Sequence, residues 1–350
     1  MNKQMLFWGS LVATVLIAIS VGVFFYYIPL QNEVEAASRV AVVSKPKYIN
    51  EFDGQAVSLK TDIDPQVIAI MIDNQTDARP QLGLAKAKIV YEVPVEGEFT
   101  RYMALYDNKQ NLAQVGPVRS ARTYFLDWLG EYGRGLYMHS GGSPDALNQI
   151  LQRNIFDANE FSWGSYYWRD AGKSAPHNLY TKSLAWQSLV TLYSTSTDKM
   201  RPGSGWKYLT TIGKPTSAQN AVKITYDPSY IVSWQYDVKA MSYVRYINGV
   251  QYLDADGSQV RARNILVQYV SVSVLDSEGR KGITTIGTGK GYVLEKGNAI
   301  IATWKKKSLT DRTRFYTSQG KEVTLLPGTT WVEVVPSDGK VNLTSGKVKN

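Results

Sequence analysis

Short apolar runs that each end in a polar cluster fill residues 67–178 and constrain the fold more than any other feature. The clusters are Ile72-Asp73-Asn74, Ala78-Arg79-Pro80-Gln81, Glu96-Gly97-Glu98, residues 116–122 (GPVRSAR), residues 139–144 (HSGGSP) and residues 175–178 (APHN). Both histidines of the chain, His139 and His177, lie within them. The ends of strands are where α/β proteins usually bind ligands. The pattern therefore predicts where a site lies, but not which reaction takes place there.

The order of the expected elements predicts an α/β part followed by a β-rich part. The continuous apolar run Val67–Ile72 is typical of a buried strand. Helical spacing is expected over 123–132, 144–151 and 181–193, and Ser143-Pro144 resembles a helix start with its capping serine. Further strands are expected at Ile89–Val95, Arg101–Tyr106, Gly135–His139, Tyr243–Ile247, Val250–Leu253, Ile265–Leu275, Tyr292–Leu294, Ala299–Trp304, Arg314–Thr317 and Thr330–Val335.

The domain organisation follows from these elements. Strands alternating with helices over residues 61–200 predict a mixed sheet with packed helices. After Val222 the pattern becomes β-rich, with a hairpin expected at Asn248-Gly249. We expect a smaller β-rich domain over residues 215–340, and residues 31–60 are polar enough for a linker.

The N-terminal segment Met5–Leu30 contains no charged residue. A bilayer is crossed by about 20 apolar residues, whereas a cleavable signal has an apolar core of roughly 7–15. Lys3 precedes the segment, and Glu33 and Glu35 follow it. We therefore expect one transmembrane helix in the cytoplasmic membrane, with the bulk of the chain on the extracytoplasmic side.

Composition excludes some chemistry and suggests partners. The chain has no cysteine, which excludes disulfides, thiolate metal sites and thiol catalysis. Residues 201–350 hold 21 Lys and Arg against 11 Asp and Glu, whereas residues 1–200 hold 18 against 19. The basic half suits an anionic lipid or envelope polymer, or is a solvated surface without a dedicated partner. No nucleic acid is expected outside the membrane.

Three weaker signals have simple interpretations. Residues 287–291 (GTGKG) lack phosphate-loop spacing and are expected to form a β-turn. Residues 254–257 (DADG) lack the glutamate of a calcium loop and are expected to form a hairpin turn. Lys305-Lys306-Lys307 is typical of a solvated strand end, or of a contact with an anionic surface.

The segment Gly116–Arg122 is the first candidate site. A strand is expected to end at Pro117 and a helix to begin near Ser120, where free backbone amides attract anions. Arg119 and Arg122 would add guanidinium groups suited to phosphate or carboxylate, with Arg101 and Arg79 joining from neighbouring strand ends. In the alternative interpretation these arginines form internal ion pairs with Glu92, Glu96, Glu98 or Asp127.

The segment His139–Pro144 repeats the arrangement of strand, glycine turn and helix start. Gly141 and Gly142 would let the backbone approach a ligand closely, although Ser143 is more simply a helix cap. His139 and His177 could act as general acid or base with Asp73 as a partner, or at least one could be a satisfied structural histidine. The candidate ligand-binding residues are Asn74, Arg79, Glu92, Glu96, Arg101, Arg119, Ser120, Arg122, Gly141, Gly142, Ser143, Arg169 and Asn178. The scattered acids and two histidines have no metal-ligand spacing, so no metal is expected, and no cofactor can be assigned.

Several motifs together resemble the YerB-like envelope proteins of bacteria, also described by a two-part DUF3048 domain. They are the clusters above, with Tyr246-x-Asn248-Gly249 and Gly297-x-x-Ile300-x-x-Thr303-Trp304-Lys305. The resemblance covers about Val67–Val335 and implies an α/β N-terminal part and a β-rich C-terminal part tethered outside the cell. Many relatives look like lipoproteins. This chain has no lipobox cysteine, so its anchor would be Met5–Leu30. The family implies no established reaction.

A fainter similarity links the chain to the LytR-CpsA-Psr phosphotransferases, which hold a polyprenyl pyrophosphate with arginines. The Thr100-Arg101 strand followed by Val118-Arg119-Ser120 is similar to their layout, but Ser120 stands where they carry an aspartate. We expect an envelope protein that binds an anionic glycan, polyprenyl phosphate or wall polymer in an arginine-lined cleft. The alternatives are an enzyme of phosphoryl or glycosyl transfer or hydrolysis that uses His139 or His177, and a structural module without a ligand.

Overall fold

The computed structural model describes residues 48–193, 203–211, 213 and 220–345. Residues from Tyr48 onward form one compact unit. The expected anchor at Met5–Leu30 lies outside the described residues. Within the described ranges, the structure contains no helix long and apolar enough to span a bilayer.

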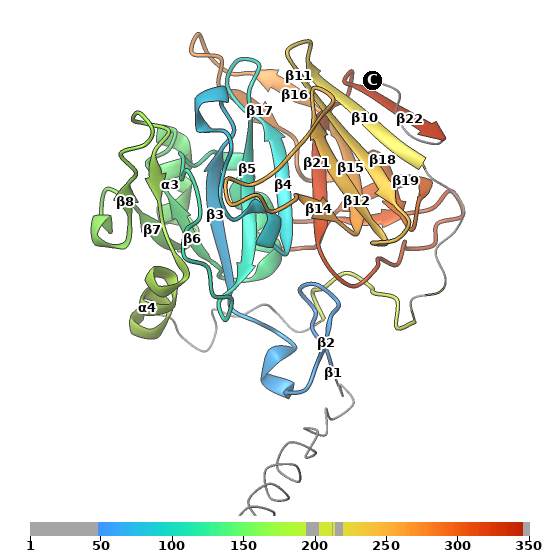
Figure 1. The fold of residues 1–350 in the computed structure, drawn as a ribbon, viewed down its shortest axis with the longest axis horizontal. Coiled ribbons are helices and arrows are strands. Elements are labelled where there is room, and N and C mark those ends of the chain that lie inside the picture. The colour runs from blue at the N-terminus through green and yellow to red at the C-terminus, as the bar shows by residue number, and fades with distance from the viewer. Residues whose placement is uncertain (1–47, 194–202, 212, 214–219, 346–350) are drawn as a thin grey trace, which may run out of the picture. The chain divides into compact units, whose positions relative to one another are not determined.

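The unit is built on a mixed ten-stranded sheet (Figure 1). Its strand order is β20 (Arg314–Tyr316), β19 (Asn298–Lys306), β18 (Gly287–Glu295), β15 (Asn264–Val270), β21 (Thr330–Pro336), β4 (Ile89–Pro94), β5 (Thr100–Asp107), β3 (Val67–Asp73), β6 (Leu136–His139) and β7 (Phe156–Asn159). The pairs β15–β21, β21–β4, β3–β6 and β6–β7 are parallel, and the others are antiparallel. Strands from residues 67–159 and from residues 264–336 therefore belong to one sheet.

A second, antiparallel sheet lies over β21, β15 and β18 (Figure 1). Its strands are β13 (Val250–Gln251), β12 (Ser242–Ile247), β11 (Tyr230–Asp237), β10 (Asn220–Asp227) and β22 (Lys340–Ser345), with β14 (Arg261–Ala262) paired to β12. The expected hairpin at Asn248-Gly249 is confirmed, because both residues have positive φ, 49° and 81°, as a two-residue turn of type I′ requires.

Short elements complete the described structure. The helices are α2 (Thr123–Leu129), α3 (Pro144–Gln152) and α4 (Ser183–Tyr193), with 3₁₀ turns η1 (Lys60–Asp62), η2 (Thr76–Ala78), η3 (Leu84–Lys86), η4 (Gly130–Tyr132) and η5 (Gly164–Tyr166). The small paired strands are β1 (Tyr48–Ile49) with β2 (Ala56–Val57), β8 (Trp168–Arg169) with β9 (Leu179–Tyr180), and β16 (Val272–Val274) with β17 (Lys281–Ile283). Ser143 caps α3 as expected, because its Oγ accepts a hydrogen bond of 3.3 Å from the Ala146 amide.

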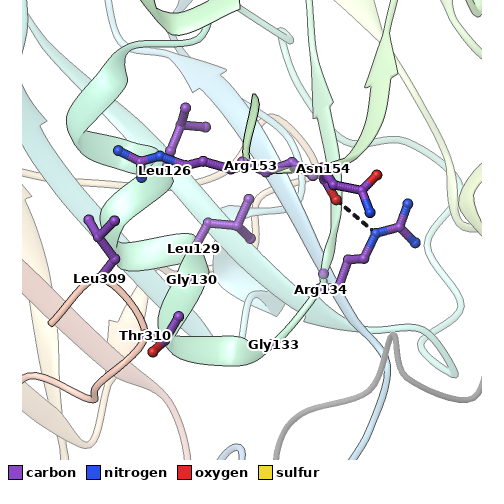
Figure 2. Close-up of a pocket in the computed structure, with 11 residues that line it drawn as sticks. Leu126, Leu129, Gly130, Gly133, Arg134, Arg153, Asn154, Leu309 and Thr310 are labelled. Atoms are coloured by element: carbon purple, nitrogen blue, oxygen red, sulfur yellow. Dashed lines mark hydrogen bonds between the residues drawn. The ribbon is translucent and has the colours of Figure 1, made fainter. Parts of the chain in front are cut away.

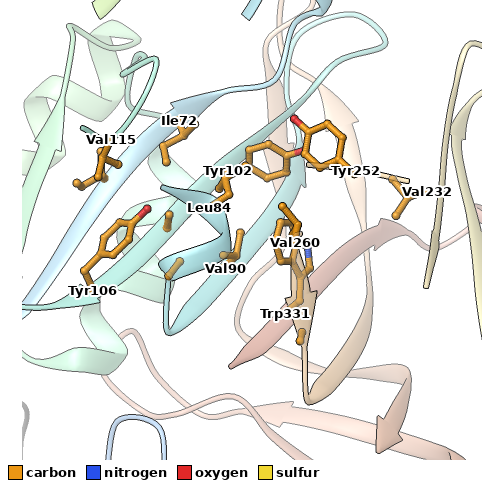
Figure 3. Packing of buried hydrophobic residues seen from close by; sticks show 14 of the residues in the cluster. Ile72, Leu84, Val90, Tyr102, Tyr106, Val115, Val232, Tyr252, Val260 and Trp331 are labelled. Atoms are coloured by element: carbon orange, nitrogen blue, oxygen red, sulfur yellow. The ribbon is translucent and has the colours of Figure 1, made fainter. Parts of the chain in front are cut away.

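The central strands of the large sheet are buried on both faces, which explains the continuous apolar run of β3. Alternate residues of a strand point to opposite faces. Ile68, Ile70 and Ile72 pack in the core that includes the six-stranded sheet, whereas Val67, Ala69 and Met71 pack in the core that includes α2. Figure 3 shows the first of these cores, which includes Val232 of the six-stranded sheet and Trp331 of the large sheet.

Three local expectations were wrong. Residues 287–291 begin strand β18 instead of forming a turn, because glycine there gives room to a cross-strand tryptophan: a Cβ on Gly289 would lie 2.5 Å from Nε1 of Trp304. The strand expected over Ile265–Leu275 is divided into β15 and β16. Lys306 is not solvated, because its side chain is buried against the carboxylate of Glu131.

Candidate functional site

The predicted polar residues gather along one edge of the large sheet. Strands β3 and β6 run parallel and end at Asp73 and His139, and β5 runs the opposite way from its start beside them. The segment before α2 crosses this edge, where the Arg119 amide donates to the Met71 carbonyl at 2.9 Å and the Ser140 amide donates to the Arg119 carbonyl at 3.1 Å. Segments distant in sequence therefore meet at the carboxyl ends of parallel strands.

Asp73 holds His177 and Arg119 in place. Its buried carboxylate lies 2.8 Å from Nδ1 of His177 and 3.1 Å from Nε of Arg119, both measured to Oδ2. Oδ1 of the same carboxylate accepts a hydrogen bond of 3.0 Å from the Gln75 amide. The side chains of Arg119 and His177 stay 23% and 13% exposed. One fixed carboxylate thus orients two groups that reach solvent.

Glu96 holds the other two arginines of this edge. It contacts Nε of Arg122, and its Oε2 lies 3.6 Å from a terminal nitrogen of Arg101. Burial by itself would raise the pKa of Glu96. The hydrogen bond from Arg122 and the charge of Arg101 outweigh burial, so the pKa of Glu96 lies below its usual value. Burial and then the charge of Arg122 lower the pKa of Arg101 to about 10, although Glu96 and Asp73 oppose the change.

The edge carries a positive surplus. Among the residues that the structure describes, Arg101, Arg119 and Arg122 form ion pairs with two carboxylates, those of Asp73 and Glu96. We call this group of five, together with His177, the arginine edge. The Ser120 carbonyl belongs to the same place, since it accepts a hydrogen bond of 2.9 Å from Arg101.

Three other candidates, Asn74, Arg79 and Glu92, lie between the two sheets. Asn74 donates to Tyr230 at 2.7 Å and accepts from Nε of Arg79 at 3.0 Å. The Arg79 guanidinium lies 4.5 Å from the centre of the Tyr230 ring. These side chains join the large sheet to strand β11 and are not part of the arginine edge.

Glu92 belongs to a buried charge cluster that the sequence analysis missed. Arg245 donates to Glu92 at 2.5 Å and to Glu333 at 2.9 Å, and all three side chains are buried. Burial and the charge of Glu92 raise the pKa of Glu333 to about 8, although Arg245 opposes the change. No local signal indicates this cluster, because its members lie on β4, β12 and β21.

His139 is enclosed rather than open. Its Nδ1 lies 2.7 Å from the Gly141 carbonyl and its Nε2 lies 2.7 Å from Asp157, and its side chain is fully buried. Gly141 has a positive φ of 61° and donates its amide to the side chain of Asn159 at 3.0 Å. Asp157 and Asn159 were missed, because β7 is only four residues long and carries two polar residues.

The remaining candidates lie beside this histidine. Arg169 donates to Asn178 at 3.0 Å and to Glu160 at 3.1 Å. Gly142 and Ser143 stand at the start of α3, where Ser143 and Arg122 line a cavity of about 190 Å³ together with Arg280 and Lys281. Asp145 and Asp276 also line this cavity, so its three cations face two carboxylates.

A separate, mostly apolar pocket of about 390 Å³ contains none of the predicted site residues (Figure 2). Its walls include Leu126, Leu129 and Leu309, and two arginines, Arg134 and Arg153, also line it. The dashed line in Figure 2 is the hydrogen bond of 2.8 Å from Nε of Arg134 to the Asn154 carbonyl. In the part of the chain that the structure describes, no group of three histidine or acidic side chains is placed to hold a metal ion.

Comparison with known proteins places the chain in a family. Residues 54–197 match the family described as "Protein of unknown function (DUF3048) N-terminal domain", and residues 222–332 match its C-terminal domain. The chain belongs to the DUF3048 family. It is 30% identical over 315 residues to "Putative lipoprotein YerB" of Bacillus subtilis (strain 168), covering 86% of this chain and 92% of the relative.

A solved structure shares this fold. The crystal structure of YerB protein from Bacillus subtilis matches with a TM-score of 0.75 and 29% sequence identity, covering 85% of this chain and all of that one. The family resemblance seen in the sequence motifs is thereby confirmed. The family description names no reaction, so a function for DUF3048 proteins has to be argued from the site.

Proposed function

We propose that the chain is an envelope-associated protein whose arginine edge binds an anionic glycan, polyprenyl phosphate or wall polymer. In this proposal Met5–Leu30 spans the cytoplasmic membrane once, and an α/β part (61–200) and a smaller β-rich part (215–340) lie on the extracytoplasmic side. Two facts support the location: the uncharged N-terminal segment and the lipoprotein name of the B. subtilis relative.

One observation carries the proposed activity: three guanidiniums share two carboxylates at the carboxyl edge of β3 and β6. A bound phosphate or carboxylate would balance the remaining charge. Arg119 suits this role because it is partly exposed while Asp73 fixes its position. Guanidinium groups form strong, forked hydrogen bonds with such anions.

A second candidate function rests on the pair formed by Asp73 and His177. A carboxylate 2.8 Å from one ring nitrogen orients a histidine for acid–base chemistry. His177 suits this role better than His139, because both ring nitrogens of His139 are engaged inside the protein. Phosphoryl or glycosyl transfer through His177 is therefore the rival proposal.

Alanine variants of the arginine edge test the binding proposal. The full chain in zwitterionic detergent is titrated calorimetrically with farnesyl phosphate, a soluble polyprenyl phosphate. Because hydrogen bonds to charged groups contribute about 1.5–3 kcal/mol each, Arg119→Ala should weaken binding about tenfold or more, and Arg119→Ala/Arg122→Ala further. Arg261→Ala is the matched control, since it removes a partly exposed arginine paired with Asp237 on the other sheet.

The possible results separate the candidates. Weaker binding at an unchanged melting temperature supports the site. Unchanged binding contradicts it, and loss of folding in the double variant supports an internal ion-pair lattice instead. His177→Gln should keep most of the affinity of a binding protein, whereas hydrolysis of the probe that disappears in this variant would favour the enzyme.

A further inference from the structure

A basic hollow lies away from the arginine edge, where β19 ends beside β20 and the start of β18. It has a volume of about 740 Å³, within the usual range for small-molecule sites. Five cationic side chains line it, Lys305, Lys306, Lys307, Arg312 and Arg314, against two carboxylates, Asp311 and Glu322. We call it the basic hollow.

The floor of the hollow contains two buried cations that share one carboxylate. Oε1 of Glu131 accepts hydrogen bonds from Lys306 at 2.9 Å and from Thr313 at 2.6 Å. Oε2 of Glu131 lies 3.7 Å from NH1 of Arg312. A buried charge without a partner is unfavourable. The two cations of the floor, Lys306 and Arg312, therefore exceed the single negative charge of Glu131 by one. This positive charge is buried, so water screens it poorly.

Arg312 is held rigidly and keeps one donor unused. Its guanidinium lies 3.8 Å from the centre of the Tyr132 ring and 4.9 Å from that of Trp206, and its Nε donates to the Ser204 carbonyl at 3.1 Å. The side chain is only 1% exposed. Within the described residues, its buried NH1 has no hydrogen-bond partner. Buried donors are normally satisfied. This one is not accessible to solvent and faces Oε2 of Glu131, so a ligand would meet the fixed charge of the guanidinium rather than a free donor.

The rim of the hollow carries exposed and ion-paired charges. Lys305 and Lys307 are exposed, and the Lys305 ammonium lies 5.1 Å from the centre of the Tyr316 ring. Arg314 donates to Glu322 at 2.6 Å, and Lys207 also pairs with Glu322 at 2.9 Å, so this carboxylate is already neutralised. The exposed Lys305 and Lys307 are therefore available to a ligand. Together with the floor they give the hollow a positive charge large enough to balance more than one negative charge.

We propose that the basic hollow binds a ligand with two adjacent phosphate charges, a diphosphate or neighbouring phosphodiesters. Arg312 and Lys306 would form the fixed floor of the site, and Lys305 and Lys307 would close over the anion. A single carboxylate would leave most of the positive surplus unmatched. This site shares no residue with the arginine edge and does not depend on the function proposed there.

Calorimetric titration of the full chain in zwitterionic detergent with inorganic pyrophosphate, at physiological salt, tests the proposal. Lys305→Ala/Lys307→Ala removes two exposed rim charges without touching the buried floor, so folding should be unaffected. We expect this variant to lose at least about tenfold in affinity. Lys239→Ala/Lys340→Ala, which removes two exposed lysines outside the hollow, should retain the parent affinity.

A floor variant and a lipid probe sharpen the result. Arg312→Lys keeps the charge but loses the guanidinium geometry, so it should weaken pyrophosphate binding. Arg119→Ala should leave pyrophosphate binding unchanged. Dihexanoyl phosphatidic acid distinguishes the source of the phosphate: competition with pyrophosphate assigns a lipid headgroup, and no competition assigns a free phosphate compound. Absent binding, or equal weakening in both lysine pairs, would overturn the proposal, because equal weakening is what nonspecific attraction produces.

Discussion

Replacing Arg245 with methionine removes the cation that pairs with both Glu92 and Glu333 and leaves these two buried carboxylates close to one another. Breaking a buried ion pair by deleting one partner typically destabilises a protein by about 3–5 kcal/mol. The total stability of a domain is about 5–15 kcal/mol, so Arg245→Met should remove a large fraction of it.

The loss of stability caused by Arg245→Met should depend on pH. In the parent, burial and Glu92 raise the pKa of Glu333 from 4.5 to about 8, so the native state binds a proton more tightly than the unfolded chain. The resulting stabilisation is fully present at low pH and is lost as pH rises through about 8. Arg245 opposes this shift. The shift should therefore grow in the variant, and Arg245→Met should cost more at pH 8 than at pH 5.

Urea unfolding followed by tryptophan fluorescence measures this effect, because Trp331 and Trp234 lie 4.5 and 5.1 Å from the Arg245 guanidinium. Arg261→Met is the matched control: its pair with Asp237 is partly exposed and should be worth at most about 1 kcal/mol. Glu92→Gln/Glu333→Gln added to Arg245→Met should restore much of the lost stability. The reasoning would be refuted if Arg245→Met lowered the free energy of unfolding by no more than Arg261→Met does. A loss of stability that does not change with pH would refute it as well.

Two further predictions concern the turn at Asp254 and the start of β18. Burial raises the pKa of Asp254 from 3.8 to about 7, so stability should fall as pH rises from 4 to 7, by up to about 4 kcal/mol. Asp254→Asn should flatten this part of a stability–pH curve from urea unfolding, and an unchanged slope would contradict the assignment. Gly289→Ala places a Cβ 2.5 Å from a cross-strand indole and should destabilise by about 1–3 kcal/mol. Gly164→Ala, with no atom within 4 Å of the new Cβ, is its control in thermal unfolding.

The parts of the fold that sequence predicts are those set by local chemistry. Three features depend only on neighbouring residues. They are the burial of β3 on both of its faces, the serine cap of α3 and the two-residue hairpin at Asn248-Gly249. The parallel pairing of β21 with β4 does not, because it joins residues about 240 positions apart. No local pattern indicates which distant strands become neighbours, so the single ten-stranded sheet was not predicted.

The same distinction holds for the candidate site. Polar residues at strand ends indicated the arginine edge, and the structure brings Asp73, Arg119 and His177 together there. Which carboxylate meets which arginine depends on how segments cross that edge. Lys306 shows the limit most clearly: its neighbours Lys305 and Lys307 are exposed, and the charge that neutralises the buried Lys306 comes from a distant acid, Glu131.

The most direct test of the proposed function is a crystal structure of the protein with farnesyl phosphate bound. We predict phosphate oxygens at about 2.7–2.9 Å from the guanidinium nitrogens of Arg119 or Arg122, as in charge-assisted hydrogen bonds. A phosphate bound elsewhere, with Asp73 and Glu96 as the sole partners of an unchanged arginine edge, would contradict that prediction.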